Sequence, residues 1–393
     1  MIENAENTKS SKKPKKLYLI IFSLCFAFIL FFILCRVLFY KSPEQQLAAI
    51  DASRAIPDSE NAAIIYNQLL EDYNESYFEP AFLNNNIETI TRTTPWSSQD
   101  YPELVNWLEQ NQNIIEKLFE VSQYENYFYP ITMSYTDYLI GKRKHLSPVK
   151  QLVFFLIRSG NNDVAENRID QALEKYINCI RIGRHFSQQP LAIDFLAGLA
   201  MEGVSLQRIR YLLVYKNLSD EQIKTIETLL PYPKLDEYYK AVLNVEAIYN
   251  RMMLQQFSLF SRLIHKISYI GKDDPSLKRL QEIFLRFAAD RHGTQIVIAL
   301  KRYKYKNGKW PEKLDEIKPY LSSEDIIIDP QNNGSFVYKL KDNSFILYST
   351  GPNRIDENGK IKAPGDDWLI WPLRTFQTQT KNTSIEPNDI TLN

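Results

Sequence analysis

Residues 17–35, LYLIIFSLCFAFILFFILC, form a run of nineteen residues without a charge, and the apolar character resumes after Arg36 as far as Tyr40. A helix of this length is about 28 Å long, close to the thickness of bilayer hydrocarbon. Five lysines precede the run, whereas only two basic residues follow it closely. Because positive charge resists translocation, we expect a transmembrane helix at 17–40, a cytoplasmic basic tail at 1–16 and the remaining chain outside the cytoplasm.

A cleaved signal peptide is the alternative interpretation of this N-terminus, because a basic start and an apolar core are common to both. The apolar core of a signal peptide spans about 7–15 residues and precedes a small-x-small cleavage site. The core here is longer, and no such site follows it. The large residues before Cys35 do not fit a lipoprotein site either, so we favour an uncleaved anchor.

The net charge and the number of cysteines bear on two questions, namely whether the chain binds nucleic acid and whether disulfides stabilise it. Forty-seven basic and forty-seven acidic residues leave no net charge, so a nucleic-acid partner, which requires a basic surface, is not expected. Cys25 and Cys35 lie in the apolar run, which leaves Cys179 alone outside it. One cysteine cannot form an internal disulfide, so we expect packing to hold the fold together.

Apolar residues at helical spacing predict a mainly α-helical domain over residues 43–278. Ser42 and Pro43 mark the first helix start, as an N-cap followed by proline in the first turn. Further helices are expected from Asp58, over 102–121, from Pro190 and over 235–270. Five tyrosines between 124 and 139 are expected to pack in the core or in loops, with a carbohydrate or peptide groove as the alternative.

The strongest helical pattern lies between Val149 and Leu213. Gly160, Ala172, Tyr176 and Cys179 fall at spacings that resemble one unit of the tetratricopeptide repeat, in which small residues let antiparallel helices pack closely. No second copy follows at a period of about 34 residues. We therefore expect one helical hairpin rather than an array of repeats.

Asp194 and Glu202 are the candidate catalytic residues, because they lie on one face of the helix expected from Pro190. Burial would raise their pKa values and suit them to acid–base chemistry. In the structural alternative, which we favour, Asp194 interacts with the helix dipole and Glu202 pairs with an arginine. The candidate partners are Arg181, Arg184 and Arg208. His185 is expected to be a cation at a helix end, since the four histidines lack zinc-ligand spacing.

Residues 279–373 show a different pattern. A helix is expected to end at Asn307-Gly308, and alternating apolar residues predict a hairpin of strands 336–340 and 344–349. In order, these pieces resemble the C-terminal part of the major pseudopilin of type II secretion. The matching residues are Tyr303, Gly308, Trp310, Pro311, Leu314, Asp329, Pro330, Tyr338, Phe345, Leu347, Tyr348, Ser349, Gly351 and Pro352.

The resemblance implies a compact module of one helix and an antiparallel hairpin. The expected fold class of the chain is therefore α+β, with a transmembrane helix, a mainly α-helical body and this pseudopilin-like module. The polar segment 374–393 is expected to be disordered. The order of anchor, helical body and module also looks like that of a group of bacterial membrane-anchored proteins.

In the major pseudopilins the loop after the hairpin binds calcium, so the resemblance implies a calcium site in the loop 350–367. The candidate ligands carry the oxygen donors that a hard cation needs, and they are Asn353, Asp356, Asn358, Asp366 and Asp367. Turn formation alone is the other explanation, because Asp and Asn favour turns for backbone reasons. No other cofactor is expected.

Three functions remain open. We favour a non-enzymatic docking or scaffold protein of the bacterial cell envelope or secretion apparatus, anchored once in the inner membrane, periplasmic for most of its length and bound to another envelope protein. The second is an enzyme that acts on envelope polymers through Asp194 and Glu202. The third is a pseudopilin-like filament subunit, although the chain lacks the pseudopilin processing motif and about 240 residues separate its anchor from the module.

Overall fold

The computed structural model describes residues 41–71, 82–139, 143–255, 275–361 and 365–373, together with Leu24, Phe26–Phe28, Phe31 and Pro80. The expected transmembrane helix at 17–40 therefore lies almost wholly outside the described residues, as does the tail 374–393. Within the described ranges, no helix combines the length and the apolar character needed to cross a membrane.

The described chain is mainly helical and contains one three-stranded antiparallel sheet, which confirms the α+β fold class. The helices are α2 (Pro43–Arg54), α3 (Ala62–Leu69), α5 (Asn85–Thr93), α6 (Pro102–Gln110), α7 (Gln112–Ser122), α8 (Tyr135–Leu139), α9 (Leu146–Ala165), α10 (Ile169–Ser187), α11 (Ala192–Tyr215), α12 (Asp220–Leu229), α13 (Leu235–Gln255) and α15 (Pro275–Asn307). Short 3₁₀ segments are η1 (Asp58–Glu60), η2 (Leu314–Tyr320) and η3 (Glu324–Ile327). The strands β1 (Val337–Lys341), β2 (Ser344–Ser349) and β3 (Trp368–Trp371) lie side by side in chain order.

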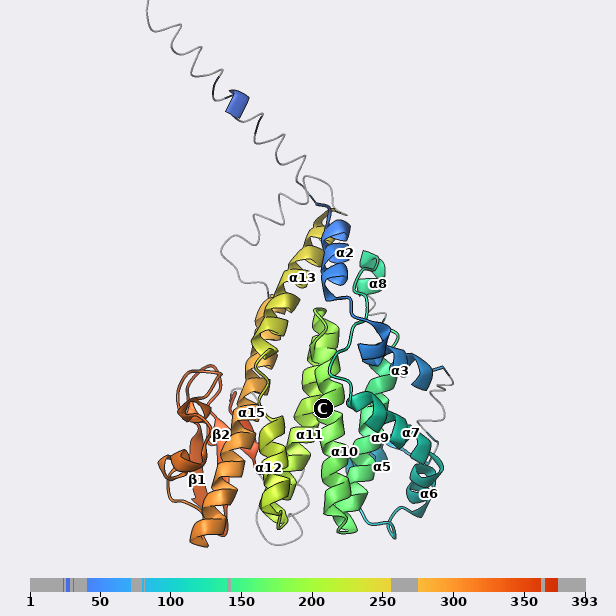
Figure 1. The fold of residues 1–393 in the computed structure, drawn as a ribbon. Helices are drawn as coiled ribbons and strands as arrows, with labels where there is room; N and C mark the ends of the chain where they lie inside the picture. Colours follow the sequence, from blue (N-terminus) through green and yellow to red (C-terminus); the bar gives the residue numbers. More distant parts are fainter. Residues whose placement is uncertain are drawn as a thin grey trace, which may run out of the picture.

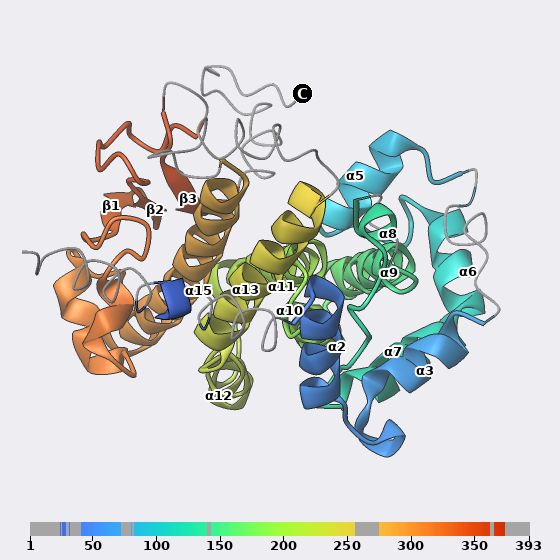
Figure 2. The ribbon, with the colours of Figure 1, turned by 90° about the horizontal axis from the view of Figure 1, so that it is seen from above.

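Helices α9, α10 and α11 form the centre of the molecule, with α10 packed on both of the others. Helix α15 packs against α11, and the sheet lies beyond α15 (Figure 1). Seen from above, α5, α6 and α7 lie on the side opposite the sheet (Figure 2). Helices α2 and α13 pack together at one end of the molecule (Figure 1).

Two glycines allow the close approach of α10 and α11. A Cβ atom at Gly183 would lie 2.8 Å from the carbonyl oxygen of Gly198, and one at Gly198 would lie 2.5 Å from the carbonyl oxygen of Gly183. Real Cβ atoms do not approach backbone so closely, so a side chain at either position would separate the two helices.

The expected helical hairpin is present as α9 and α10. A Cβ atom at Gly160 would lie 2.7 Å from Cε1 of Tyr176, so the tyrosine ring fills the space that this glycine leaves. The Tyr176 hydroxyl donates a hydrogen bond to Oδ1 of Asn161 over 2.7 Å. Cys179 is buried in the same contact and is a free thiol.

Some helix limits differ from the sequence-based expectation. The single helix expected over 102–121 is wrong, because the chain breaks at Asn111 into α6 and α7. The Asn111 side chain donates to the carbonyl oxygen of Trp107 over 2.7 Å and so replaces helical backbone bonding. The helix expected from Asp58 starts instead at Ala62, where Asn61 is the N-cap and accepts from the Ala63 N–H.

The helical body and the C-terminal module share one hydrophobic core. Helix α15 crosses the expected boundary at 278/279, and buried residues from Tyr66 to Trp371 belong to one continuous cluster. Ile370 of β3 fills the space beside Gly293 of α15, where a Cβ atom would lie 2.5 Å from its Cγ2. The module therefore packs against the body of its own chain.

Candidate cation site in the loop between β2 and β3

The loop from 350 to 367 leaves β2 and returns to β3, and its two ends are held close together at Gly351. This residue has φ +65°, a conformation that favours glycine. A Cβ atom at this position would lie 2.5 Å from both the carbonyl oxygen and Oδ1 of Asp366. Only a glycine leaves this space open beside the Asp366 carboxylate.

Three carboxylates converge in this loop, those of Glu357, Asp366 and Asp367. One carboxylate oxygen of each lies within 4.8 Å of the other two. Each group also has one oxygen held by a hydrogen bond. The Asn353 side chain donates to Glu357 Oε1 over 2.7 Å and its backbone N–H donates to Asp366 Oδ2 over 3.3 Å. The Gly359 N–H donates to Asp367 Oδ2 over 2.7 Å.

The second oxygen of each carboxylate has no such partner. Among the described residues, Glu357 Oε2, Asp366 Oδ1 and Asp367 Oδ1 are buried atoms that accept no hydrogen bond. The side chain of Asp367 is completely buried. Burying ionised oxygens without a compensating charge costs several kcal/mol, so a bound cation, or a proton at lower pH, would stabilise this arrangement.

The donor set fits calcium. Calcium binds oxygen ligands at about 2.3–2.6 Å, so oxygens on opposite sides of one ion are about 5 Å apart. Three carboxylate oxygens within 4.8 Å of one another can therefore share one ion. Backbone carbonyls or water would complete the six to eight ligands that calcium prefers.

The electrostatics of the loop agree with this geometry. Burial raises the pKa of Asp367 to about 6, and the neighbouring carboxylate of Glu357 adds to the effect. Burial also raises the pKa of Asp366, whereas the hydrogen bond from Asn353 lowers the pKa of Glu357. A proton would therefore compete with a cation chiefly for the carboxylate of Asp367, because its pKa is raised to about 6.

The other sequence candidates have different roles. Asp356 and Asn358 face Lys339, whose Nζ lies 3.2 Å from Asp356 Oδ2 and 3.1 Å from Asn358 Oδ1. The Tyr348 hydroxyl donates to Asp356 Oδ1 over 2.6 Å and lowers the pKa of this carboxyl. Asn353 donates hydrogen bonds to two carboxylates of the cluster and so orients them. Of the five candidates, the structure thus brings only Asp366 and Asp367 into the carboxylate cluster.

Sequence reasoning missed Glu357. It lies between two of the predicted ligands, in the stretch Asp356-Glu357-Asn358. Its carboxylate is an oxygen donor of the same kind as theirs and could have been included from the sequence. The sequence does not show which of these oxygen donors meet, because the direction in which each side chain points depends on how the loop closes.

The candidate catalytic residues Asp194 and Glu202 are buried and lie beside arginines. Asp194 Oδ2 lies 2.7 Å from Arg143, and burial raises the pKa of Asp194 in spite of this charge. Glu202 Oε1 lies 3.3 Å from Arg184 and 3.1 Å from Arg291. This pairing supports the structural interpretation of both acids.

Two of the partners suggested for Glu202 are wrong. Arg181 donates to the side chain of Gln123, and Arg208 donates to the carbonyl oxygen of Thr93. Arg291, the missing partner, lies on α15 and is 89 residues away in the sequence. The spacing of residues along one helix does not predict a contact with a residue of another helix.

The expectation that His185 is a helix-end cation is also wrong. The end of α10 lies inside the molecule, where burial lowers the pKa of His185 to about 4 and leaves the ring neutral at pH 7. The ring bonds to the Tyr66 hydroxyl at Nδ1 over 2.9 Å and to the Tyr124 carbonyl oxygen at Nε2 over 2.8 Å. Since the carbonyl only accepts, Nε2 carries the proton.

The tyrosines between 124 and 139 contribute to packing. Tyr127 is buried and its hydroxyl bonds to His145 over 3.0 Å. Tyr138 stacks on Tyr249 with 3.9 Å between the ring centroids. The packing interpretation is therefore confirmed for these two residues.

A separate cavity of about 420 Å³ lies between α6–α7 and α9–α10. Phe119 and neighbouring apolar residues line one wall, and polar residues of α9 and α10 line the other. Asp163 on the polar wall pairs with Arg168 over 2.7 Å and with Lys175. These opposite charges thus neutralise one another in part.

Comparison of the chain with protein-family models, with curated proteins and with solved structures found no match.

Proposed function

We propose that this chain is a single-pass membrane-anchored scaffold of the bacterial cell envelope, whose helical body and cation-binding C-terminal module form one periplasmic unit that binds another envelope protein. The cluster of Glu357, Asp366 and Asp367 is the observation that carries the proposal. Three carboxylates with buried oxygens that accept no hydrogen bond from a donor group repel one another, and a shared cation would relieve this repulsion at pH 7. The cation has a structural role here, since it closes a loop instead of lining a substrate cavity.

The attachment of α2 supports a tethered scaffold. This helix begins directly after the apolar run, and its carboxylate at Asp51 accepts the backbone N–H groups of Ile131 and Thr132 over 3.0 and 2.9 Å. Arg54 donates to Gln189 Oε1 over 2.8 Å. An anchor at 17–40 would therefore tether the whole body through α2, which is bonded to it.

The two other functions require features that the described residues and the sequence do not offer. The enzyme hypothesis requires Asp194 and Glu202 to face a substrate, whereas both are buried beside arginines. A filament subunit would need the processing motif that the sequence lacks. The pairing of the two acids thus favours a scaffold over an envelope hydrolase.

Calcium titration of the full chain tests the proposal. After removal of bound metal with a chelator, isothermal titration of the detergent-solubilised protein should show one calcium ion per chain. We expect Asp367→Asn to weaken binding at least tenfold, because it removes the charge of the fully buried ligand.

Asp315→Asn is the matched control for this experiment. Asp315 belongs to the same module but is exposed and pairs with Lys318 over 2.8 Å, so its substitution should leave calcium binding unchanged. The absence of both binding heat and any rise in melting temperature at millimolar calcium would refute the cation site.

A further inference from the structure

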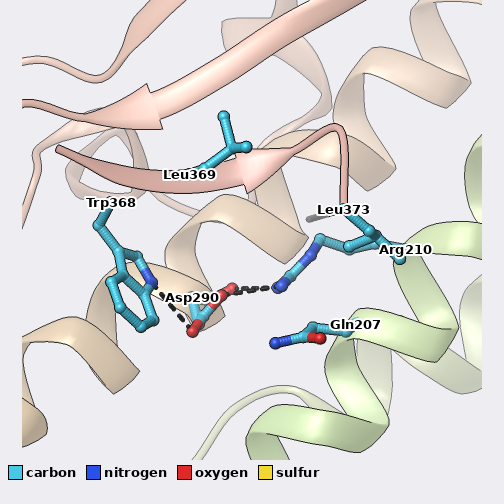
Figure 3. A pocket seen from close by; sticks show the side chains of 6 residues that line it. All are labelled: Gln207, Arg210, Asp290, Trp368, Leu369 and Leu373. Atoms are coloured by element: carbon cyan, nitrogen blue, oxygen red, sulfur yellow. Dashed lines mark hydrogen bonds and ion pairs between the residues drawn. The ribbon is translucent and has the colours of Figure 1, made fainter. Parts of the chain in front are cut away.

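One buried aspartate joins the helical body to the C-terminal module. Asp290 of α15 accepts from Arg210 of α11 at Oδ1 over 2.8 Å and from the indole N–H of Trp368 at Oδ2 over 3.1 Å (Figure 3). Arg210 is 1% exposed and Asp290 is 5% exposed. We call these three residues the Asp290 joint.

The Asp290 joint is further supported from α15. Arg210 also donates to the backbone carbonyl of Asp290 over 3.1 Å and to the Thr294 hydroxyl over 2.8 Å. A cavity of about 60 Å³ adjoins the three side chains, and Gln207, Leu369 and Leu373 complete its lining (Figure 3). Displacement of the indole would remove one hydrogen-bond donor from the buried Asp290 carboxylate.

The carboxylate cluster is covalently connected to this joint. Asp366 and Asp367 directly precede Trp368, the first residue of β3. The Arg286 guanidinium lies 5.2 Å from the centre of the Trp368 ring, and its charge partly offsets the rise that burial causes in the pKa of Asp366. The position of the indole thus depends on the position of the two aspartates.

We propose that a cation bound by Glu357, Asp366 and Asp367 stabilises the Asp290 joint, so that cation binding determines how firmly the module is held on the helical body. This inference rests on the proposed cation site. With the cation bound, two of the three negative charges are compensated and the backbone before Trp368 is fixed. Without it, the carboxylates repel one another and the start of β3 is released from the position that the indole hydrogen bond requires.

By thermodynamic linkage, the coupling can be measured as the effect of calcium on the Asp290 joint or as the effect of the joint on calcium affinity. If calcium stabilises the joint, then an intact joint must strengthen calcium binding by the same factor. The substitution Trp368→Phe keeps an aromatic ring on β3 and removes the N–H that bonds to Asp290. We expect it to weaken calcium binding three- to tenfold while one ion per chain is still bound.

Hydrogen exchange in the full detergent-solubilised chain reports on the joint itself. Saturating calcium should slow amide exchange at least tenfold in residues 207–211 of α11 and 290–294 of α15. Neither segment contains a cation ligand. The protection should disappear in Glu357→Gln, whereas the control Asp315→Asn should behave like the natural chain.

The outcomes separate this inference from the cation site. If calcium binds but exchange in 207–211 is unchanged, and Trp368→Phe binds calcium as tightly as the natural chain, the coupling is refuted and the cation site remains. If calcium does not bind the natural chain, both fail. Should Trp368→Phe not fold, as judged by circular dichroism, Asp290→Asn serves for the same affinity measurement, and unchanged affinity again refutes the coupling.

Discussion

At the residue scale, the interior of this protein contains ionisable groups whose state is set by burial. The rings of His145 and His185 both contact those of Tyr66 and Tyr127. Burial lowers the pKa of His145 and of His185 to about 4, from an ordinary value of 6.5. Both rings are therefore neutral in the folded protein at pH 7.

These two histidines predict a loss of stability in acid. Between pH 6.5 and about 4 the unfolded chain binds more protons than the folded protein, so the stabilisation is complete above pH 6.5 and is lost as the pH falls. At pH 5 the loss is about 2 kcal/mol for each histidine. Urea unfolding of the natural chain at a series of pH values between 7.5 and 4.5 measures this loss in the free energy of unfolding.

The variant His145→Gln separates this effect from that of other titrating groups. Glutamine retains hydrogen-bonding capacity toward Tyr127 and Asn67, the present partners of the ring, but it cannot take up a proton. The variant should be less stable at pH 7 and should lose about 2 kcal/mol less between pH 7 and 5. Parallel pH profiles for the two proteins would contradict the assignment.

At the element scale, the contact between α10 and α11 depends on backbone approach at Gly183 and Gly198. We predict that Gly198→Ala destabilises the protein by about 1–3 kcal/mol, because the added methyl group meets the backbone of α10. Chemical denaturation gives the free energy of unfolding.

Gly203→Ala is the matched control, because Gly203 lies on the same helix with open space where its Cβ would be. Alanine has the higher helix propensity by about 1 kcal/mol, so this variant should be as stable as the natural chain or more stable. Equal destabilisation by both substitutions would show that the close contact is not the cause.

At the scale of the whole molecule, the expected location of the protein in the cell envelope depends on the apolar run at 17–35. We predict that the protein stays in the membrane fraction after an alkaline wash and that protease added to the periplasmic side digests the helical body. N-terminal sequencing of the purified protein should start before Leu17. A soluble periplasmic protein that starts after Cys35 would contradict the anchored arrangement.

Local signals in the sequence predicted much of the helical architecture. The capping box at Ser42 and the close fit of Gly160 to Tyr176 lie within one helix start or one hairpin, where spacing along the chain determines what meets. The β1–β2 hairpin is similar, since Val337 to Lys341 pair with Ser344 to Tyr348 across a short turn. For these features the sequence alone was sufficient.

Contacts between distant segments were decided only by the tertiary structure. Arg291 reaches Glu202 from 89 residues away, and Asp290 joins Arg210 to Trp368 across three elements. The resemblance to the major pseudopilins implied a cation site in the loop 350–367, but the folded loop brings Glu357, Asp366 and Asp367 together and places Asp356 beside Lys339. The physical reason is that helix and hairpin periodicity follows from neighbouring residues, whereas burial and charge pairing depend on which surfaces meet when the chain folds.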